Sequence, residues 1–136
     1  MGANRLVLDS GALSALAEEK SGVRRYLERA IEEKTEIAVP TVVIAESTTG
    51  SARDAALNNV LRVLEPTMVE LSEELAREAG ALRYRARRPL RDTIDAIIVA
   101  TADASAGSAI LTADAGDMAA LAAVRRRSPV LLLGHH

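Results

Sequence analysis

The sequence predicts an α/β fold with a short, mostly parallel central sheet flanked by helices. Short aliphatic runs, the first at residues 5–8, alternate with longer segments of helical pattern. The aliphatic runs are continuously apolar, which is typical of parallel strands that are covered on both faces. With 136 residues, the chain is long enough for one domain, which we expect to span residues 1–134.

The element boundaries follow from aliphatic runs, turn residues and caps. We expect strands at residues 5–8, 36–39, 68–71, 109–112 and 130–133. We expect helices at residues 12–19, 22–33, 41–46, 54–64, 72–87, 93–106 and 116–124. Thr41 and Ser72 are the predicted caps of their helices. Pro40 closes the second strand, and Pro66 ends a helix.

Composition excludes several kinds of catalysis. The chain has no cysteine, so disulfides, thiolate metal sites and cysteine nucleophiles are excluded. The only histidines are the last two residues, His135 and His136, which we expect to be a tag remnant (residues 135–136). This argues against a Ser-His-Asp triad and against a histidine-ligated zinc site. The chemistry is therefore expected to use carboxylates, hydroxyls, arginines and a hard metal ion.

Charge and hydropathy suggest where the chain works and what it contacts. No apolar run is long enough to span a membrane and no signal peptide is recognisable, so we expect a cytoplasmic protein. The net charge of −2 argues against a general nucleic-acid coat but is compatible with a nucleic-acid enzyme. Only Tyr26 and Tyr84 are aromatic, so we expect no base-stacking platform of the RNA-recognition type.

Five acidic residues stand at strand ends or in apolar segments. They are Asp9, Glu46, Asp95, Asp114 and Asp117. Each aspartate, taken alone, is explained as well by a helix cap or a turn. Glu46 is harder to explain in this way, because it lies inside its predicted helix.

Together, these acids fit one end of a parallel sheet. Converging carboxylates repel one another and raise their pKa values unless a cation lies between them. Mg²⁺ or Mn²⁺ would satisfy such an oxygen-rich site. A bound ion of this kind polarises a phosphoryl oxygen and activates water near neutral pH, so no histidine base is needed.

Four segments, in order along the chain, carry a resemblance to a known family. They are Val7-Leu8-Asp9-Ser10, Val43-Ile44-Ala45-Glu46, residues 94–102, and residues 110–117. The sequence resembles the PIN-domain ribonucleases and, among them, the VapC-type toxins of toxin–antitoxin pairs. The resemblance covers essentially the whole chain and implies a PIN-like three-layer sandwich.

The resemblance also implies an activity and a set of site residues. The activity is metal-dependent endonucleolytic hydrolysis of RNA by a metal-activated water, with inhibition by a VapB-type antitoxin, and the family usually forms homodimers. The implied catalytic and metal-binding residues are Asp9, Glu46, Asp95, Asp114 and Asp117, where either Asp114 or Asp117 is the direct ligand. Ser10 and Thr112 match the hydroxyl residues beside the metals. Asp92 is an additional acid, interpreted first as a cap and second as an outer support of the site.

The arginines after residue 82 have two interpretations. Arg83, Arg87 and Arg91 recur every four residues and would share one helix face if the helix continued past Pro89. They could then hold RNA phosphates next to Asp95. Alternatively, they form a solvated helix end where cations suit the helix dipole.

Two other functions remain open at this stage. One is a PIN nuclease of RNA processing that has no antitoxin. The other is a non-catalytic α/β regulatory module, such as a phospho-accepting receiver. A receiver needs an acidic pair near its first strand and a lysine near its end, whereas Asp9 has no acidic neighbour and no lysine follows Lys34.

Overall fold

Five parallel strands form one sheet, in the order β3-β2-β1-β4-β5. The computed structural model describes residues 4–18, 21–113, 116–124 and 130–132. The strands are β1 (Arg5–Leu8), β2 (Glu36–Pro40), β3 (Thr67–Val69), β4 (Ser108–Thr112) and β5 (Val130–Leu132). Each neighbouring pair is parallel, so the predicted parallel sheet is confirmed.

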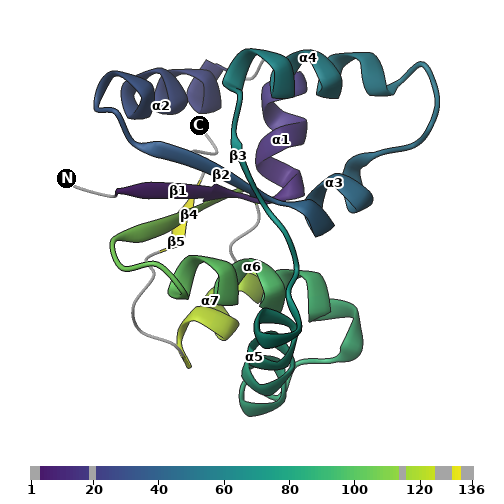
Figure 1. Cartoon of the computed structure of the whole chain (residues 1–136), viewed down its shortest axis with the longest axis vertical. Coiled ribbons are helices and arrows are strands. Elements are labelled where there is room, and N and C mark those ends of the chain that lie inside the picture. Colours follow the sequence, from purple (N-terminus) through teal and green to yellow (C-terminus); the bar gives the residue numbers. More distant parts are fainter. Residues whose placement is uncertain (1–3, 19–20, 114–115, 125–129, 133–136) are drawn as a thin grey trace.

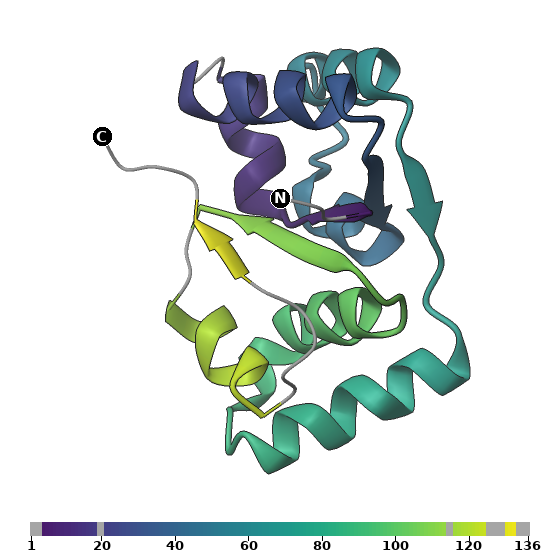
Figure 2. The same ribbon diagram turned by 90° about the vertical axis from the view of Figure 1, so that its left-hand side faces the viewer.

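Helices cover both faces of this sheet and make a three-layer sandwich (Figures 1 and 2). The first four helices are α1 (Ser10–Ala17), α2 (Ser21–Glu32), α3 (Thr41–Ser47) and α4 (Asp54–Leu64). The later helices are α5 (Glu73–Arg85), the 3₁₀ turn η1 (Leu90–Asp92), α6 (Thr93–Asp103) and α7 (Gly116–Ala122). In both views α1, α2 and α4 lie on one face of the sheet, and α5, α6 and α7 lie on the other.

The strand order explains this division of the helices. The chain first moves outward from β1 to β2 and β3, and then crosses to the other side of β1 to form β4 and β5. Because crossovers between parallel strands are right-handed, reversing the direction of travel places the later helices on the opposite face. The reversal occurs between β1 and β4, which are neighbours in the middle of the sheet.

The core is built on these two central strands. Leu6, Val7 and Leu8 are at most 1% exposed, and all five residues of β4 are buried. Helix α6 packs on one face of the sheet with an unbroken buried stretch from Ala96 to Asp103. Burial on both faces accounts for the continuously apolar sequence of the central strands.

Some helix ends differ from the prediction. Thr41 is the first residue of α3, and Pro40 precedes it without a side-chain cap, so Thr41 is not the cap. The predicted cap of α5 is confirmed, because the Ser72 hydroxyl accepts a hydrogen bond from the Leu75 backbone N–H at 3.1 Å. Helix α6 ends at Asp103 rather than at residue 106, four residues before the left-handed Gly107 begins the approach to β4.

Over the described ranges, no helix combines the length and apolar character needed to cross a lipid bilayer. Several residues singled out in the sequence lie outside the described ranges, among them Arg125-Arg126-Arg127, Leu133 and the terminal pair His135 and His136.

Candidate active site

The reversal between β1 and β4 creates a crevice at the carboxyl ends of these strands, where α/β sheets commonly place their functional sites. Asp9 directly follows β1, and Thr112 is the last residue of β4. Gly11 allows the two ends to approach closely, because a Cβ atom there would lie 3.1 Å from the Cβ of Ala113. The Asp9 backbone N–H also donates to the Leu111 carbonyl, at 3.4 Å.

Asp9 is both a helix cap and a buried acid. Its Oδ1 accepts a hydrogen bond from the Ala12 backbone N–H at 2.8 Å, which caps α1. The side chain also hydrogen bonds with the hydroxyl of Thr112. Asp9 is only 7% exposed. The capping hydrogen bond does not prevent Asp9 from binding a metal, because a carboxylate can accept about four hydrogen bonds and coordinate a cation as well.

The environment of Asp9 opposes its negative charge. Burial raises the pKa of the Asp9 carboxyl above the ordinary aspartate value, and the nearby charge of Glu46 raises it further. Hydrogen bonds from Thr112 and the Ala12 N–H lower the pKa but only partly offset burial. A buried carboxyl whose ionised form is disfavoured in this way would be stabilised by a bound cation.

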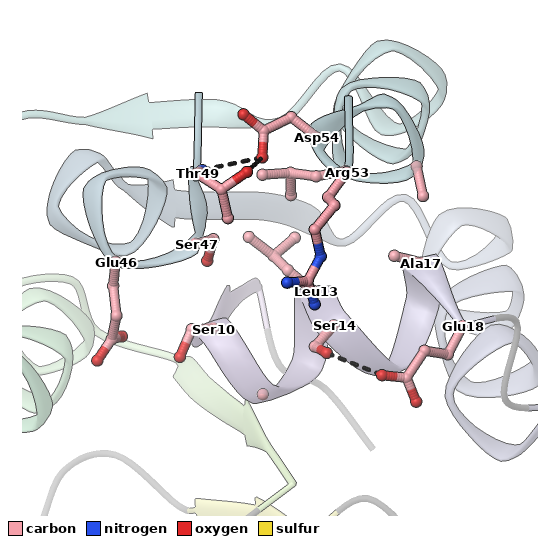
Figure 3. Close-up of a pocket in the computed structure, with 13 residues that line it drawn as sticks. Ser10, Leu13, Ser14, Ala17, Glu18, Glu46, Ser47, Thr49, Arg53 and Asp54 are labelled. Atoms are coloured by element: carbon pink, nitrogen blue, oxygen red, sulfur yellow. Dashed lines mark hydrogen bonds between the residues drawn. The ribbon is translucent and has the colours of Figure 1, made fainter. Parts of the chain in front are cut away.

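Glu46 reaches this site from α3. The sequence placed Glu46 in an apolar segment, but its side chain is exposed, because the short helix α3 buries only Val43. Glu46 and Ser10 line one end of a pocket of about 500 Å³ between α1 and the α3–α4 region. Figure 3 shows the Glu46 carboxylate and the Ser10 hydroxyl at the same end of this pocket. The structure thus brings together Asp9, Glu46 and the two predicted hydroxyl residues.

Asp92 and Asp95 both lie at the start of α6. Asp92 is 3% exposed and makes no cap bond; its Oδ2 instead pairs with Arg88 Nε at 2.7 Å. Asp92 thus stands at the N-cap position of α6, as predicted, but its side chain forms an ion pair and makes no capping hydrogen bond. Asp95 is half-buried in the first turn of α6, where a negative charge suits the helix dipole.

The remaining acids are only partly described. Asp114 lies outside the described residues, and only the backbone of Asp117 is described, near the start of α7. Among the described side chains, no group of three acidic, histidine or cysteine residues is close enough to hold a metal. The donor set that does converge is all oxygen: two carboxylates with the hydroxyls of Ser10 and Thr112. This set fits a hard divalent cation such as Mg²⁺ or Mn²⁺.

The pocket contains a cation that sequence reasoning missed. Arg53 precedes α4, and its guanidinium extends into the pocket near Ser14 (Figure 3). Asp54 holds the preceding loop by accepting hydrogen bonds from the backbone N–H of Thr49 at 2.9 Å and of Gly50 at 2.7 Å. The Thr49 hydroxyl also donates to Asp54, and this bond is the main cause that lowers the pKa of Asp54. In the sequence, this ordered loop was signalled by the run of turn-forming residues before Asp54, because such runs order a loop locally.

The predicted arginine face does not extend past α5. The helix ends at Arg85, and Arg87 adopts a left-handed backbone with φ of 57°. The backbone N–H groups of Arg87 and Arg88 then close the helix end on the carbonyls of Tyr84 and Arg83. Arg91 lies in η1, so it does not continue the face of Arg83 and Arg87.

A comparison with family models decides the classification. The PIN domain model matches residues 6–124. The chain belongs to the PIN domain family. The predicted membership, and with it the expectation of a PIN-type nuclease fold, is confirmed.

Solved structures share this fold at low sequence identity. A toxin–antitoxin complex from Klebsiella pneumoniae aligns with a TM-score of 0.71 and 18% identity, covering 96% of this chain and 99% of that chain. VapBC2 from Rickettsia felis, bound to a DNA fragment from its promoter, aligns with a TM-score of 0.75 and 14% identity, again covering 96% of this chain and 99% of that chain. PAE2754 from Pyrobaculum aerophilum aligns with a TM-score of 0.58 and 18% identity, covering 94% of this chain and 90% of that chain. No curated protein matches the sequence.

Proposed function

We propose that this PIN domain is a metal-dependent endoribonuclease, and that it acts as a toxin controlled by an antitoxin. The observation that carries the proposal is the environment of Asp9. A buried carboxyl at the strand reversal, with its pKa raised by burial and by Glu46, is poised to receive a divalent cation. Structural likeness to two toxin–antitoxin complexes along nearly the full chain supports the toxin assignment.

Each site residue has a defined role in this proposal. Asp9 and Glu46 would hold Mg²⁺ or Mn²⁺, together with Asp95 and either Asp114 or Asp117. When bound, the ion supplies a polarised phosphoryl oxygen and a nucleophilic water near neutral pH. Thr112 and the Ala12 N–H keep the Asp9 carboxylate in one orientation, since both hydrogen bond to it. Ser10, which lines the pocket with Glu46, would place its hydroxyl beside the bound ion.

The exposed arginines supply the remaining part of an RNA-binding surface. Arg87 and Arg91 are exposed on the α5–η1 segment, and Arg83 Nη1 donates to Thr93 Oγ1 at 2.8 Å. Thr93 lies two residues before Asp95, so these cations border the start of the helix that carries the acid. Contacts from arginine to phosphate would position an RNA strand without reading its sequence.

An apolar groove next to the pocket is the proposed contact for the antitoxin. It has a volume of about 500 Å³ and is lined by residues of α1, α2 and α4. Ile31 and Val63 line it and are 53% and 68% exposed, which is unusual for large aliphatic side chains grouped together. The groove and the pocket lined by Ser10 and Glu46 share Ala17 and Ala56, so one continuous partner segment could fill both.

Cleavage of end-labelled RNA during titration with Mg²⁺ or Mn²⁺ tests the enzymatic part. We expect cleavage that requires the ion, stops with EDTA, and leaves a 5′ phosphate. Glu46→Gln should abolish it, whereas the matched control Glu74→Gln, on the exposed side of α5, should not. Metal-independent cleavage, or equal activity of the two variants, would contradict the proposal.

If a small protein is encoded beside this chain, neutralisation by that protein tests the toxin part. We expect that protein to inhibit RNA cleavage by the wild type but not by the double variant Ile31→Glu with Val63→Glu. Leu71→Glu, which adds one negative charge at an exposed apolar position outside the groove, should stay inhibited. If the wild type cleaves RNA and the neighbouring protein neither binds nor inhibits it, the enzyme is instead a PIN nuclease without an antitoxin.

A further inference from the structure

The end of α5 and the turn η1 enclose a second hollow, of about 680 Å³. It is lined by Arg83, Tyr84, Arg85, Arg87, Arg88, Pro89 and Leu90, and is called here the arginine hollow. Tyr84 is 83% exposed and Leu90 is 76% exposed. One of the two aromatic side chains of the protein therefore lies in water among four arginines.

Two polar contacts fasten the arginine hollow to the start of α6. Arg83 donates to Thr93 at 2.8 Å, and Arg88 pairs with the buried carboxylate of Asp92 at 2.7 Å. Both partners lie at the start of α6, within three residues of Asp95. The arginine hollow is thus held at a fixed position relative to the first turn of α6, which contains Asp95.

The arginine at position 87 is unfavourable for the backbone. Its φ of 57° lies in the left-handed region, and the closing turn of a helix at this position usually has glycine. An arginine here adds a cation to the hollow but brings backbone strain. None of the residues that line the hollow is acidic, so its rim is strongly positive.

We propose that the arginine hollow binds one unpaired nucleotide of single-stranded RNA, with the base stacked on Tyr84 and neighbouring phosphates held by Arg85 and Arg87. An exposed aromatic ring flanked by arginines is the combination that binds unstacked bases. Duplex RNA keeps its bases stacked and paired, so the hollow would favour single strands. This inference rests on the proposed RNA substrate and gives it a preference that the sequence did not predict, because the scarcity of aromatics argued against stacking.

Binding of fluorescent RNA in EDTA tests the inference without cleavage. The probes are a uridine-rich 12-nucleotide strand and a hairpin of the same length. We expect Tyr84→Ala to weaken binding of the single strand by about 5- to 150-fold, the loss of one stacked base. Tyr84→Phe should bind like the wild type, because the ring remains. Arg77→Ala, an exposed arginine on α5 outside the hollow, is the matched control.

Salt dependence separates stacking from phosphate contact. Tyr84→Ala should leave the slope of log affinity against log salt unchanged. Arg85→Ala and Arg87→Gly should each reduce that slope by about 0.7, the value for one phosphate contact on a single strand. Arg87→Gly should also unfold at a Tm no lower than that of the wild type, because glycine relieves the left-handed strain. A loss of RNA affinity without a loss of stability would show that the arginine serves binding.

Fluorine NMR of protein labelled with 3-fluorotyrosine reports on the ring itself. The two signals are assigned with Tyr26→Phe, and only the Tyr84 signal should shift when the single-stranded probe is added. Wild-type affinity of Tyr84→Ala, or an unmoved Tyr84 signal, would overturn the inference even if the protein cleaves RNA. Conversion of a dimer to a monomer by Tyr84→Ala, measured by light scattering, would overturn it in favour of a contact between copies. Tyr84-dependent binding without metal-dependent cleavage would support the hollow and refute the proposed enzyme.

Discussion

The candidate active site around Asp9 and the arginine hollow are built in opposite ways. Asp9 is buried at the end of a central strand, and two hydrogen bonds and the packing of Gly11 fix its orientation. Tyr84 and Arg87, by contrast, are exposed at a helix end that closes in a strained turn. Burial perturbs the pKa of Asp9, whereas exposure leaves the ring of Tyr84 available to a ligand.

This contrast separates two tasks within one small domain. A site that concentrates charge on a metal needs low solvent exposure and fixed side chains, since both strengthen electrostatic interactions. A surface that captures a flexible strand needs accessible rings and cations. The two regions meet at the start of α6, which contains Asp95 and the partners of Arg83 and Arg88.

The largest expected effect distinguishes catalysis from binding. Asp9→Asn should lower the rate of metal-dependent RNA cleavage by at least about 100-fold, because even groups that only support metal ligands contribute about 10- to 100-fold. The affinity for single-stranded RNA in EDTA should stay within about twofold of wild type, since Asn also caps a helix well. Parallel cleavage and binding assays give both numbers, and a large loss of RNA binding in EDTA would contradict the division of tasks.

An intermediate effect is expected where the two regions are joined. Arg88→Ala leaves the buried carboxylate of Asp92 without its partner, and we expect a loss of about 2–3 kcal/mol of stability, below the full cost of a buried pair because Arg88 is partly exposed. Thermal or urea unfolding measures this loss. Arg85→Ala, for which we expect a change within about 0.5 kcal/mol, is the control. Equal stability of the two variants would show that the ion pair of Arg88 with Asp92 stabilises the fold no more than Arg85 does.

The smallest effect concerns pH. The raised pKa of Asp9 in the folded protein means that its contribution to stability is complete below the ordinary aspartate pKa of about 3.9 and is lost as pH rises through the folded value. In metal-free protein, Asp9→Asn should therefore have a higher Tm than the wild type at neutral pH. The difference should shrink as pH falls through the folded pKa of Asp9 toward about 3.9, the ordinary aspartate value, and should be lost below it. Calorimetry across this range in EDTA checks the sign, and a wild-type protein that is the more stable at pH 7 would contradict it.

Much of the fold could be predicted from sequence because its signals are local. The aliphatic run of β1 and the helix at 54–64 are found where they were predicted. The position of Asp9 at a strand end was also readable, since parallel strands place their carboxyl ends together. These features depend on a few neighbouring residues and on a general rule of sheet topology.

Other features depended on contacts between distant residues or on exposure, which a sequence does not state. The sequence alone could not show that Asp92 forms an ion pair with Arg88 instead of a capping hydrogen bond. It also could not show that Glu46 is exposed to solvent and not buried. The left-handed turn at Arg87 was hidden because glycine, its usual signal, is absent. The small number of aromatic residues predicted no base-stacking surface, because composition does not show that Tyr84 is exposed among arginines.

Binding of Mg²⁺ to metal-free protein, measured by titration calorimetry, tests most directly whether Asp9 and Glu46 act as one site. We predict that Asp9→Asn and Glu46→Gln each weaken binding at least tenfold, and that the double variant loses clearly less than the sum of the two free-energy losses. Glu74→Gln should bind like the wild type. Wild-type affinity in either single variant, or fully additive losses in the double variant, would contradict a shared cation between these two carboxylates.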